Sequence, residues 1–138
     1  LLTKPDVFNH NVETVKRLYQ KARPQANYER SLEFLRYVKE KNADILTKSG
    51  FMVGLGETME EITELMTDLK RVNCDIVTVG QYIQPTKENL PVERYLTVEE
   101  FDEIREIALK IGIKHVVSAP LVRSSYKAGN IFINGRKI

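Results

Sequence analysis

One stretch, a strand-like segment that runs into two glycines and a helix start, constrains the fold more than any other part of the sequence. Residues 45–53 are rich in β-branched and apolar side chains, which favours a buried strand. Gly54 and Gly56 follow at once, and Thr58 and Glu61 then have the spacing of a capping box. Apolar residues recur on one helical face beyond the cap: Ile62, Leu65, Met66, Leu69 and Val72. The stretch predicts a strand, a glycine turn and a helix, and α/β proteins bind ligands at such turns.

The remaining segments continue the alternation of strand and helix. Further strands are expected at residues 7–11, 75–83 and 114–118, with a short strand and an Asn-Gly turn at 131–136. Further helices are expected to begin at Asn11, Asn27 and Thr97, and the last of them to end at Gly112. Residues 84–91 and 120–129 are predicted loops. Alternating strands and helices imply the α/β class, with a parallel sheet and right-handed crossovers.

Four parallel strands are too few for a closed barrel and are unfavourable as an open sheet. We therefore expect the chain to form half of a larger folded unit. The chain also begins with Leu1 rather than methionine, and we expect that a larger N-terminal part precedes it. Its 138 residues are typical of a single domain, here 1–138 with a C-terminal tail from about residue 120.

Composition excludes several functional classes. The net charge is +2 and no run of Lys and Arg reaches five residues, so we expect no nucleic-acid partner. No apolar stretch approaches the roughly 18 residues of a membrane span, so we expect no membrane partner. Cys74 is the only cysteine, which excludes an internal disulfide and indicates a reducing, cytoplasmic location.

Polar side chains gather where the predicted strands end. They are Asn9, His10, Asn11, Glu13, Glu57, Gln81, Tyr82, Arg123, Ser124, Ser125 and Tyr126. Because the carboxyl ends of parallel strands share one face, we expect an active site there. Plainer interpretations exist: His10 as a structural histidine, Asn11 as a helix cap, and Arg30 as a solvated surface charge. Ser124 and Ser125 could be ordinary loop residues.

The glycines do not have the spacing of a dinucleotide-binding fingerprint or of a P-loop. The pattern Gly50-x-Met52-x-Gly54-x-x-Glu57 instead resembles the G-x-I-x-G-x-x-E signature of radical S-adenosylmethionine enzymes. In that family the segment passes the adenine of S-adenosylmethionine, where glycine lets a flat ring approach the backbone. Taken alone, however, these glycines could simply shape a turn between strand and helix.

Five further segments extend the resemblance. They read Asn9-His-Asn-Val-Glu-Thr14, Asn27-Tyr-Glu-Arg-Ser-Leu32, Val79-Gly-Gln-Tyr-Ile-Gln-Pro85, Leu90-Pro-Val-Glu-Arg-Tyr95 and Pro120-Leu-Val-Arg-Ser-Ser-Tyr126. In order and separation the set resembles the lipoyl synthases, over roughly residues 6–129. The resemblance implies a partial (half) parallel β/α barrel of the radical S-adenosylmethionine type. It also implies that the intact enzyme inserts sulfur at C6 and C8 of a protein-bound octanoyl chain.

The resemblance assigns roles by position. Asn11 and Glu13 would hold the ribose hydroxyls of S-adenosylmethionine, and Arg30 its methionyl carboxylate. The residues implied to flank the adenine are Met52, Val53, Gly54 and Leu55. Those implied to bind substrate are Asn9, Gln81 and Tyr82. Ser125 would be a catalytic oxygen ligand on one iron of an auxiliary cluster, positioned by Arg123.

The implied cofactors are S-adenosylmethionine and two four-iron, four-sulfur clusters, whose cysteine ligands would precede Leu1. The implied partners are an octanoylated carrier, such as the glycine cleavage H protein or a dehydrogenase E2 component, and an electron donor such as ferredoxin or flavodoxin. Ala119 and Asn89 depart from the family pattern without touching a proposed ligand. Two alternatives stay open: a sulfur insertion like that of biotin synthase, against which Arg123-Ser-Ser-Tyr126 argues, and a non-catalytic scaffold without clusters.

Overall fold

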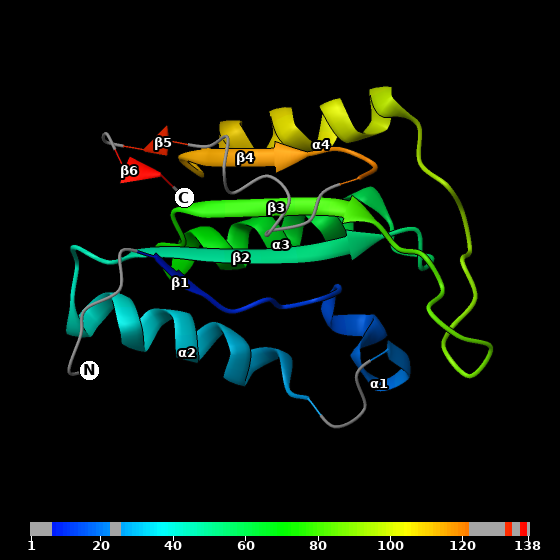
Figure 1. The fold of residues 1–138 in the computed structure, drawn as a ribbon, viewed down its shortest axis with the longest axis horizontal. Coiled ribbons are helices and arrows are strands. Elements are labelled where there is room, and N and C mark those ends of the chain that lie inside the picture. Colours follow the sequence, from blue (N-terminus) through cyan, green and yellow to red (C-terminus); the bar gives the residue numbers. More distant parts are fainter. Residues whose placement is uncertain (1–6, 23–25, 122–131, 134–135, 138) are drawn as a thin grey trace.

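The computed structural model describes residues 7–22, 26–121, 132–133 and 136–137, and its main body is a four-stranded parallel sheet (Figure 1). The strands are β1 (Val7–Asn9), β2 (Leu46–Val53), β3 (Ile76–Gln81) and β4 (His115–Ser118), hydrogen-bonded in that order. The helices are α1 (Tyr19–Ala22), preceded by the 3-10 turn η1 (Lys16–Leu18), α2 (Tyr28–Lys41), α3 (Met59–Arg71) and α4 (Val98–Ile111). A separate antiparallel pair joins β5 (Phe132–Ile133) to β6 (Arg136–Lys137). The predicted α/β class is therefore confirmed.

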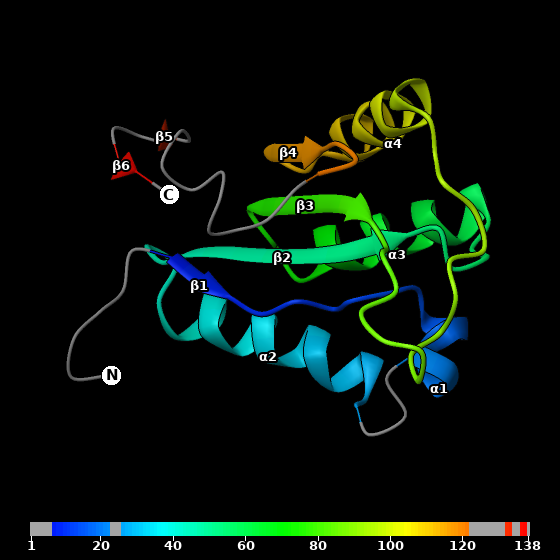
Figure 2. The same cartoon turned by 45° about the vertical axis from the view of Figure 1, so that its right-hand side comes forward.

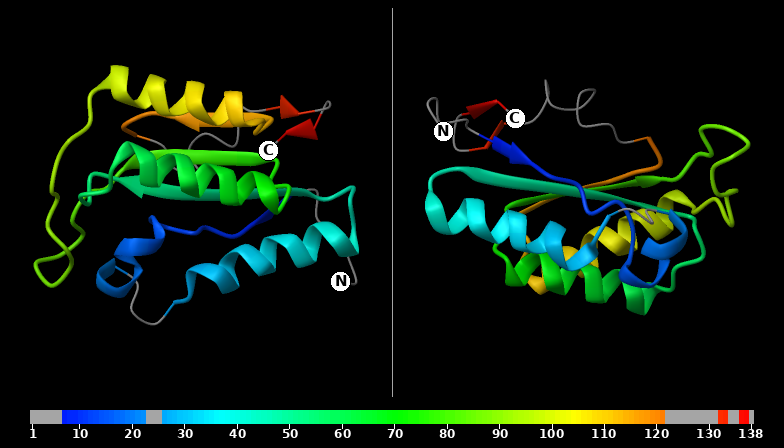
Figure 3. Two further views of the ribbon diagram at one scale, coloured as in Figure 1. Left: turned by 180° about the vertical axis from the view of Figure 1, so that it is seen from behind. Right: turned by 90° about the horizontal axis from the view of Figure 1, so that it is seen from below.

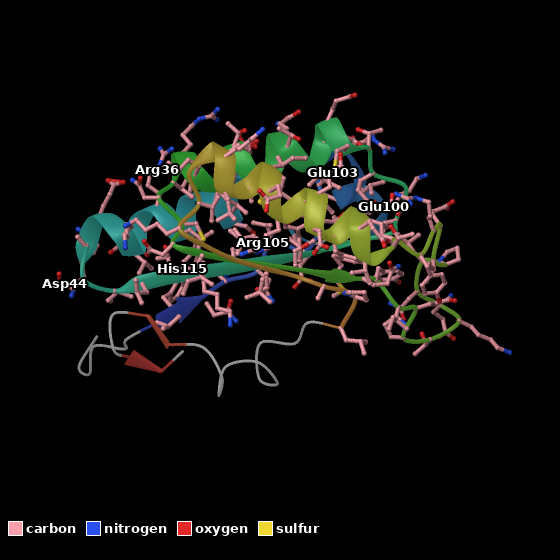
Figure 4. All side chains as sticks on the ribbon, turned by 90° about the horizontal axis from the view of Figure 1, so that it is seen from above. Arg36, Asp44, Glu100, Glu103, Arg105 and His115 are labelled. Atoms are coloured by element: carbon pink, nitrogen blue, oxygen red, sulfur yellow. The ribbon has the colours of Figure 1, made fainter. Side chains whose placement is uncertain are left out.

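The three long helices, α2, α3 and α4, all cover the same face of the parallel sheet (Figures 2 and 3). Charged side chains such as Arg36 and Glu103 project from these helices away from the strands (Figure 4). Parallel strands with helices on one side only are the arrangement found in a segment of a β/α barrel. The expected partial barrel agrees with this layout.

Side chains alternate between the two faces of the sheet, as the pleat requires. Phe51, Val53, Val77 and Val79 point toward the helices and join the main hydrophobic core. The opposite face, which we call the inner face, carries the intervening residues. On β2 these are Leu46, Lys48, Gly50 and Met52, and on β3 they are Ile76, Thr78 and Gly80.

The predicted helix caps are confirmed with one exception. Thr58 with Glu61 and Thr97 with Glu100 both form complete capping boxes, and the Asn27 side chain accepts a hydrogen bond from the backbone N–H of Arg30. Local sequence spacing is sufficient to form these caps, because each joins residues only three positions apart.

The exception is Asn11, which was expected to start a helix directly after β1. The backbone instead continues along the edge of β2, where the N–H groups of Val12 and Glu13 donate to the Gly50 carbonyl at 3.1 Å. The Glu13 carbonyl accepts from the Met52 N–H at 2.9 Å, and the 3-10 turn begins only at Lys16. The expectation was wrong because pairing with β2 outweighs the local capping preference of asparagine.

A buried carboxylate, Asp75, lies at the N-terminal end of β3 and is 2% exposed. It accepts hydrogen bonds from the Lys39 ammonium at 2.6 Å and from the Thr47 backbone N–H at 2.9 Å. Lys39 also donates to the Ile45 carbonyl at 3.0 Å. These contacts connect α2 to the two central strands.

We expect Asp75→Ala to destabilise the full-length protein by about 1–3 kcal/mol, the range for leaving a buried donor without its acceptor. The loss arises because the buried Thr47 N–H would lose its acceptor, while the half-buried Lys39 ammonium would keep only the Ile45 carbonyl. Urea denaturation measures the change. Asp102→Ala, at an exposed position on α4, is the matched control and should shift the free energy of unfolding by less than about 0.5 kcal/mol.

Candidate site at the C-terminal edge of the sheet

The segment that follows β1 carries polar side chains onto the inner face of the sheet. A Cβ atom placed on Gly50 would lie 3.3 Å from Asn11 Oδ1 and 2.4 Å from Thr78 Oγ1. Glu13 has a φ of 75°, in the left-handed region, at the point where this segment pairs with Phe51. The Tyr19 hydroxyl donates to the Val12 carbonyl and holds the segment from the other side. Because Gly50 has no side chain, the Asn11 amide can pack closely against the inner face of β2.

A cavity of about 240 Å³ lies between this segment and the start of α2. Its lining residues are His10, Asn11, Glu13, Tyr19, Ala26, Asn27, Arg30, Ser31 and Phe34. Asn11, Glu13 and Arg30 therefore come together around one space. The family resemblance implies that these three residues hold the ribose and the carboxylate of one cofactor. The cap that Asn27 forms on α2 fixes the turn of helix from which Arg30 projects.

His10 belongs to an aromatic stack at the same cavity. Its ring lies 5.2 Å from that of Phe34, at an interplanar angle of 18°, and Phe34 stacks in turn on Phe8 at 6.0 Å. Offset stacking of this kind stabilises the packing of β1 against α2. This contact supports the structural interpretation of His10.

The glycine turn after β2 is closed by the glutamate of its own motif. The Glu57 carboxylate accepts hydrogen bonds from the Gly54 and Leu55 backbone N–H groups at 3.0–3.1 Å. Met52, on the inner face, is 39% exposed, whereas Val53 and Leu55 are buried in the core on the helical side. Among the residues that the resemblance assigns to the adenine, Met52 therefore has an accessible side chain on the inner face. The side chains of Val53 and Leu55 are buried, so only their backbone could contact a ligand there.

The long connection from β3 to α4, residues 82–97, folds back over this turn, and we call it the strap. The Gln81 amide donates to the Tyr82 and Arg94 carbonyls and accepts from the Leu96 N–H, each at 3.0 Å. The Tyr82 hydroxyl donates to the Leu90 carbonyl at 2.7 Å, and the Glu93 N–H donates to the Gly54 carbonyl at 2.8 Å. Gln81 and Tyr82 hence position the strap, a function that sequence reasoning missed; their contact with substrate stays a prediction.

The other predicted site residues are placed in part. Asn9 ends β1, in register with Lys48, and is exposed. Arg123 and Ser125 lie outside the described residues. Within the described ranges, no group of three His, Cys, Asp or Glu side chains could hold a metal ion. Cys74 is buried, and this burial raises the pKa of its thiol to about 12, so the group stays protonated and is a poor metal ligand.

An ion pair supports the helix that follows the glycine turn. Arg17 donates to the Glu61 carboxylate at 2.6 and 3.0 Å and to the Gly56 carbonyl at 2.9 Å. The Arg17 guanidinium beside the carboxylate, together with the bond from the Thr58 N–H, lowers the pKa of Glu61 to about 2. The pair connects the segment before α1 to the start of α3.

We expect Glu61→Gln to lower the stability of the full-length protein at neutral pH by about 0.5 kcal/mol, within the range for partly exposed ion pairs. Glutamine can still complete the capping box, so the loss is that of the charge that pairs with Arg17. A depressed carboxylate pKa contributes stability above the unfolded value of about 4.3, and this contribution is lost as the pH falls toward 2. The stability difference between wild type and Glu61→Gln should therefore shrink between about pH 5 and 2 in a series of denaturation curves. Glu60→Gln, in the same first turn of α3, should show no such dependence.

Comparison with known proteins identifies the family of the chain. The sequence profile of the radical SAM superfamily, the enzymes that use S-adenosylmethionine as a radical source, matches residues 1–69, which is half of the chain. The chain therefore belongs to the radical SAM superfamily. No helix among the described residues is long and apolar enough to cross a membrane.

Within this superfamily the chain is similar to lipoyl synthases. It is 58% identical to the lipoyl synthase of Caldanaerobacter subterraneus subsp. tengcongensis over 125 residues, which cover 91% of this chain and 44% of that protein. It is 56% identical to that of Bacillus subtilis, with 91% of this chain and 42% of that protein aligned. It is also 56% identical to the lipoyl synthase of Vibrio parahaemolyticus, with 90% of this chain and 39% of that protein aligned. The chain thus spans about two-fifths of the length of these relatives, and the resemblance expected from the motifs is confirmed.

Proposed function

We propose that the full-length protein containing this chain is a lipoyl synthase. The observation that carries the proposal is the cavity shared by Asn11, Glu13 and Arg30 beside the glycine turn, in a chain 56–58% identical to lipoyl synthases. When bound, S-adenosylmethionine and an iron–sulfur cluster would supply a 5′-deoxyadenosyl radical that takes hydrogen from C6 and C8 of an octanoyl chain, and a second cluster would supply the sulfur. The C–H bonds are unactivated, so side-chain acids and bases cannot break them, and the protein acts by binding and orientation.

The described residues fit the polar groups of S-adenosylmethionine. An amide at Asn11 and a carboxylate at Glu13 suit ribose hydroxyls, each of which donates and accepts. Arg30, in the same cavity, offers a planar fork that matches a carboxylate. The adenine would lie against Met52 and the backbone of residues 53–55, where the missing side chain of Gly54 keeps the turn close to the sheet.

The remaining assignments concern the auxiliary cluster, the substrate and the electron donor. Ser125 would ligate one iron of the auxiliary cluster, with Arg123 beside it, and the cysteine ligands of both clusters would come from another part of the protein. The substrate would be an octanoylated carrier such as the H protein or an E2 component, contacted by Asn9, Gln81 and Tyr82. A ferredoxin or flavodoxin would donate electrons, and the reaction would take place in the cytoplasm.

Product analysis tests the proposal. The full-length protein, with its clusters reconstituted, is incubated with an octanoylated carrier peptide, S-adenosylmethionine and a reductant, and the peptide is examined by mass spectrometry. We expect 5′-deoxyadenosine and a peptide that has gained two sulfur atoms. Sulfur insertion into dethiobiotin, with none into the octanoyl peptide, would favour the alternative like biotin synthase. A protein that binds no iron and cleaves no S-adenosylmethionine would be the non-catalytic scaffold.

A second measurement concerns Arg30 alone. If its guanidinium pairs with the methionyl carboxylate, Arg30→Ala should weaken binding of S-adenosylmethionine by about 1.5–3 kcal/mol, the range for hydrogen bonds to charged groups. Calorimetric titration of the full-length protein measures the change, and circular dichroism should show an intact fold because Arg30 is exposed. Arg36→Ala, six residues further along α2, is the control. Equal affinity in both variants would return Arg30 to the role of a solvated surface charge.

A further inference from the structure

Lys48 is a cationic residue in an unusual place, the inner face of the central strand β2. Figure 1 looks onto this face, with α3 behind it. Lys48 is in register with Asn9 on β1 and with Ile76 on β3, and it is 4% exposed. It lies one step below Gly50 on the same face, and Gly50 is the residue against which Asn11 is placed. Lys48 therefore lies on the inner face, in the layer of side chains next to that of Gly50 and Asn11.

The surroundings of Lys48 do not compensate its charge. Over the described part of the chain, no carboxylate pairs with Lys48 and no acceptor takes a hydrogen bond from its ammonium group, although eight other Lys and Arg side chains do form ion pairs with carboxylates. Burial lowers the pKa of Lys48, with no opposing contribution from an acid. A buried lysine is normally paired, because an isolated ammonium loses its hydration and gains no ion pair or hydrogen bond in exchange.

We propose that Lys48 is an anion-binding residue, whose ammonium group pairs with a carboxylate that is brought onto the inner face from outside this chain. The carboxylate has two possible sources. One is an acidic side chain from the rest of the protein, packed against the inner face. The other is the carboxylate of the bound S-adenosylmethionine, a source that rests on the proposed function.

Both sources lie within reach of the side chain. Residues two apart on a strand are separated by about 6.6 Å, and the flexible four-carbon stem of lysine spans a comparable distance. Lys48 can therefore extend along the inner face to the layer of Gly50, Asn11 and Thr78, or remain in its own layer beside Asn9. In either position the ammonium group presents three donors to an incoming anion.

The test uses the full-length protein in four forms: wild type, Lys48→Gln, Lys48→Arg and the control Lys87→Gln. Lys87 is an exposed lysine on the strap. The Lys87→Gln substitution therefore removes one positive charge from the surface, as Lys48→Gln removes one from the interior. Two quantities are measured for each form at neutral pH. One is the thermal midpoint of unfolding without ligand, and the other is the affinity for S-adenosylmethionine by equilibrium dialysis.

The two sources give different results. If the carboxylate belongs to the cofactor, Lys48→Gln should weaken binding by about tenfold or more. The thermal midpoint without ligand should then be unchanged or raised, because the variant no longer buries an unpaired charge. If it belongs to the protein, Lys48→Gln should lower the midpoint by roughly 2–4 °C or more, with affinity within about twofold of wild type. In both cases Lys48→Arg should retain a substantial part of the lost property, and Lys87→Gln should match wild type.

The proposal is overturned if Lys48→Gln matches wild type in both measurements, or raises the midpoint without loss of affinity. Failure of Lys48→Gln to fold, with Lys48→Arg folded, supports a protein carboxylate. Failure of both variants to fold shows that the position needs the shape of lysine rather than its charge, which contradicts the proposal. If wild type binds no S-adenosylmethionine, the proposed function fails, and the thermal midpoints still decide whether Lys48 meets a carboxylate of the protein.

Discussion

Gly54→Ala in the full-length protein is expected to abolish measurable binding of S-adenosylmethionine and to lower stability substantially. Gly54 has a φ of 104°, a conformation that costs a residue with a side chain about 1–3 kcal/mol. An added Cβ would lie 2.4 Å from Gln81 Nε2 and 2.5 Å from the Arg94 carbonyl oxygen. Because both atoms hold the strap, the clash would displace it, and overpacking of this kind costs about a further 1–3 kcal/mol.

Gly56→Ala is a closely matched control for this prediction. Gly56 has a similar φ of 101°, but a Cβ there would meet only the Glu93 side chain, at 3.6 Å, which is an ordinary contact. Its loss should be limited to the backbone cost, and binding should persist. Urea denaturation and calorimetric titration of both variants separate the two effects. Equal losses in Gly54→Ala and Gly56→Ala would show that the contact with the strap is unimportant.

The second large effect is expected at Ser125, whose role comes from the resemblance to lipoyl synthases. An oxygen is a poorer partner for iron in a sulfur-rich cluster than a thiolate is, so a serine ligand suits a cluster that must release its sulfur. Ser125→Cys would place a soft thiolate at that corner. We expect this variant to cleave S-adenosylmethionine still, while sulfur insertion into the octanoyl peptide falls steeply.

Ser124 provides the neighbouring control, because the two serines would behave alike if both were ordinary loop residues. Ser124→Ala should lose less sulfur insertion than either Ser125→Cys or Ser125→Ala. Mass spectrometry compares 5′-deoxyadenosine with lipoylated peptide for each variant. If Ser125→Cys and Ser125→Ala both insert sulfur at the rate of the parent enzyme, Ser125 is not a functional ligand.

The sequence by itself determined the elements whose signals are local. Both capping boxes, the cap at Asn27 and the left-handed end of α4 at Gly112 form as their spacing predicts. Each depends on residues within one or two turns of each other, so the sequence pattern contains nearly all the relevant interactions. The parallel direction of the four strands followed from their alternation with helices. The motifs also led to the superfamily without any knowledge of contacts.

The tertiary structure alone decided what depends on distant pairs of residues. Asn11 could have been a helix cap, and pairing with β2, nearly 40 positions later, made it a residue of the inner face instead. The motif gave Gln81 no role in the connection after β3, and only the folded chain shows its amide bonded to the Arg94 carbonyl and the Leu96 N–H. The buried, unpaired state of Lys48 within the described chain is likewise invisible in a motif. Periodicity reports which face of an element is apolar, whereas the partner of a polar group depends on which strand lies beside it, and that is settled only when the chain has folded.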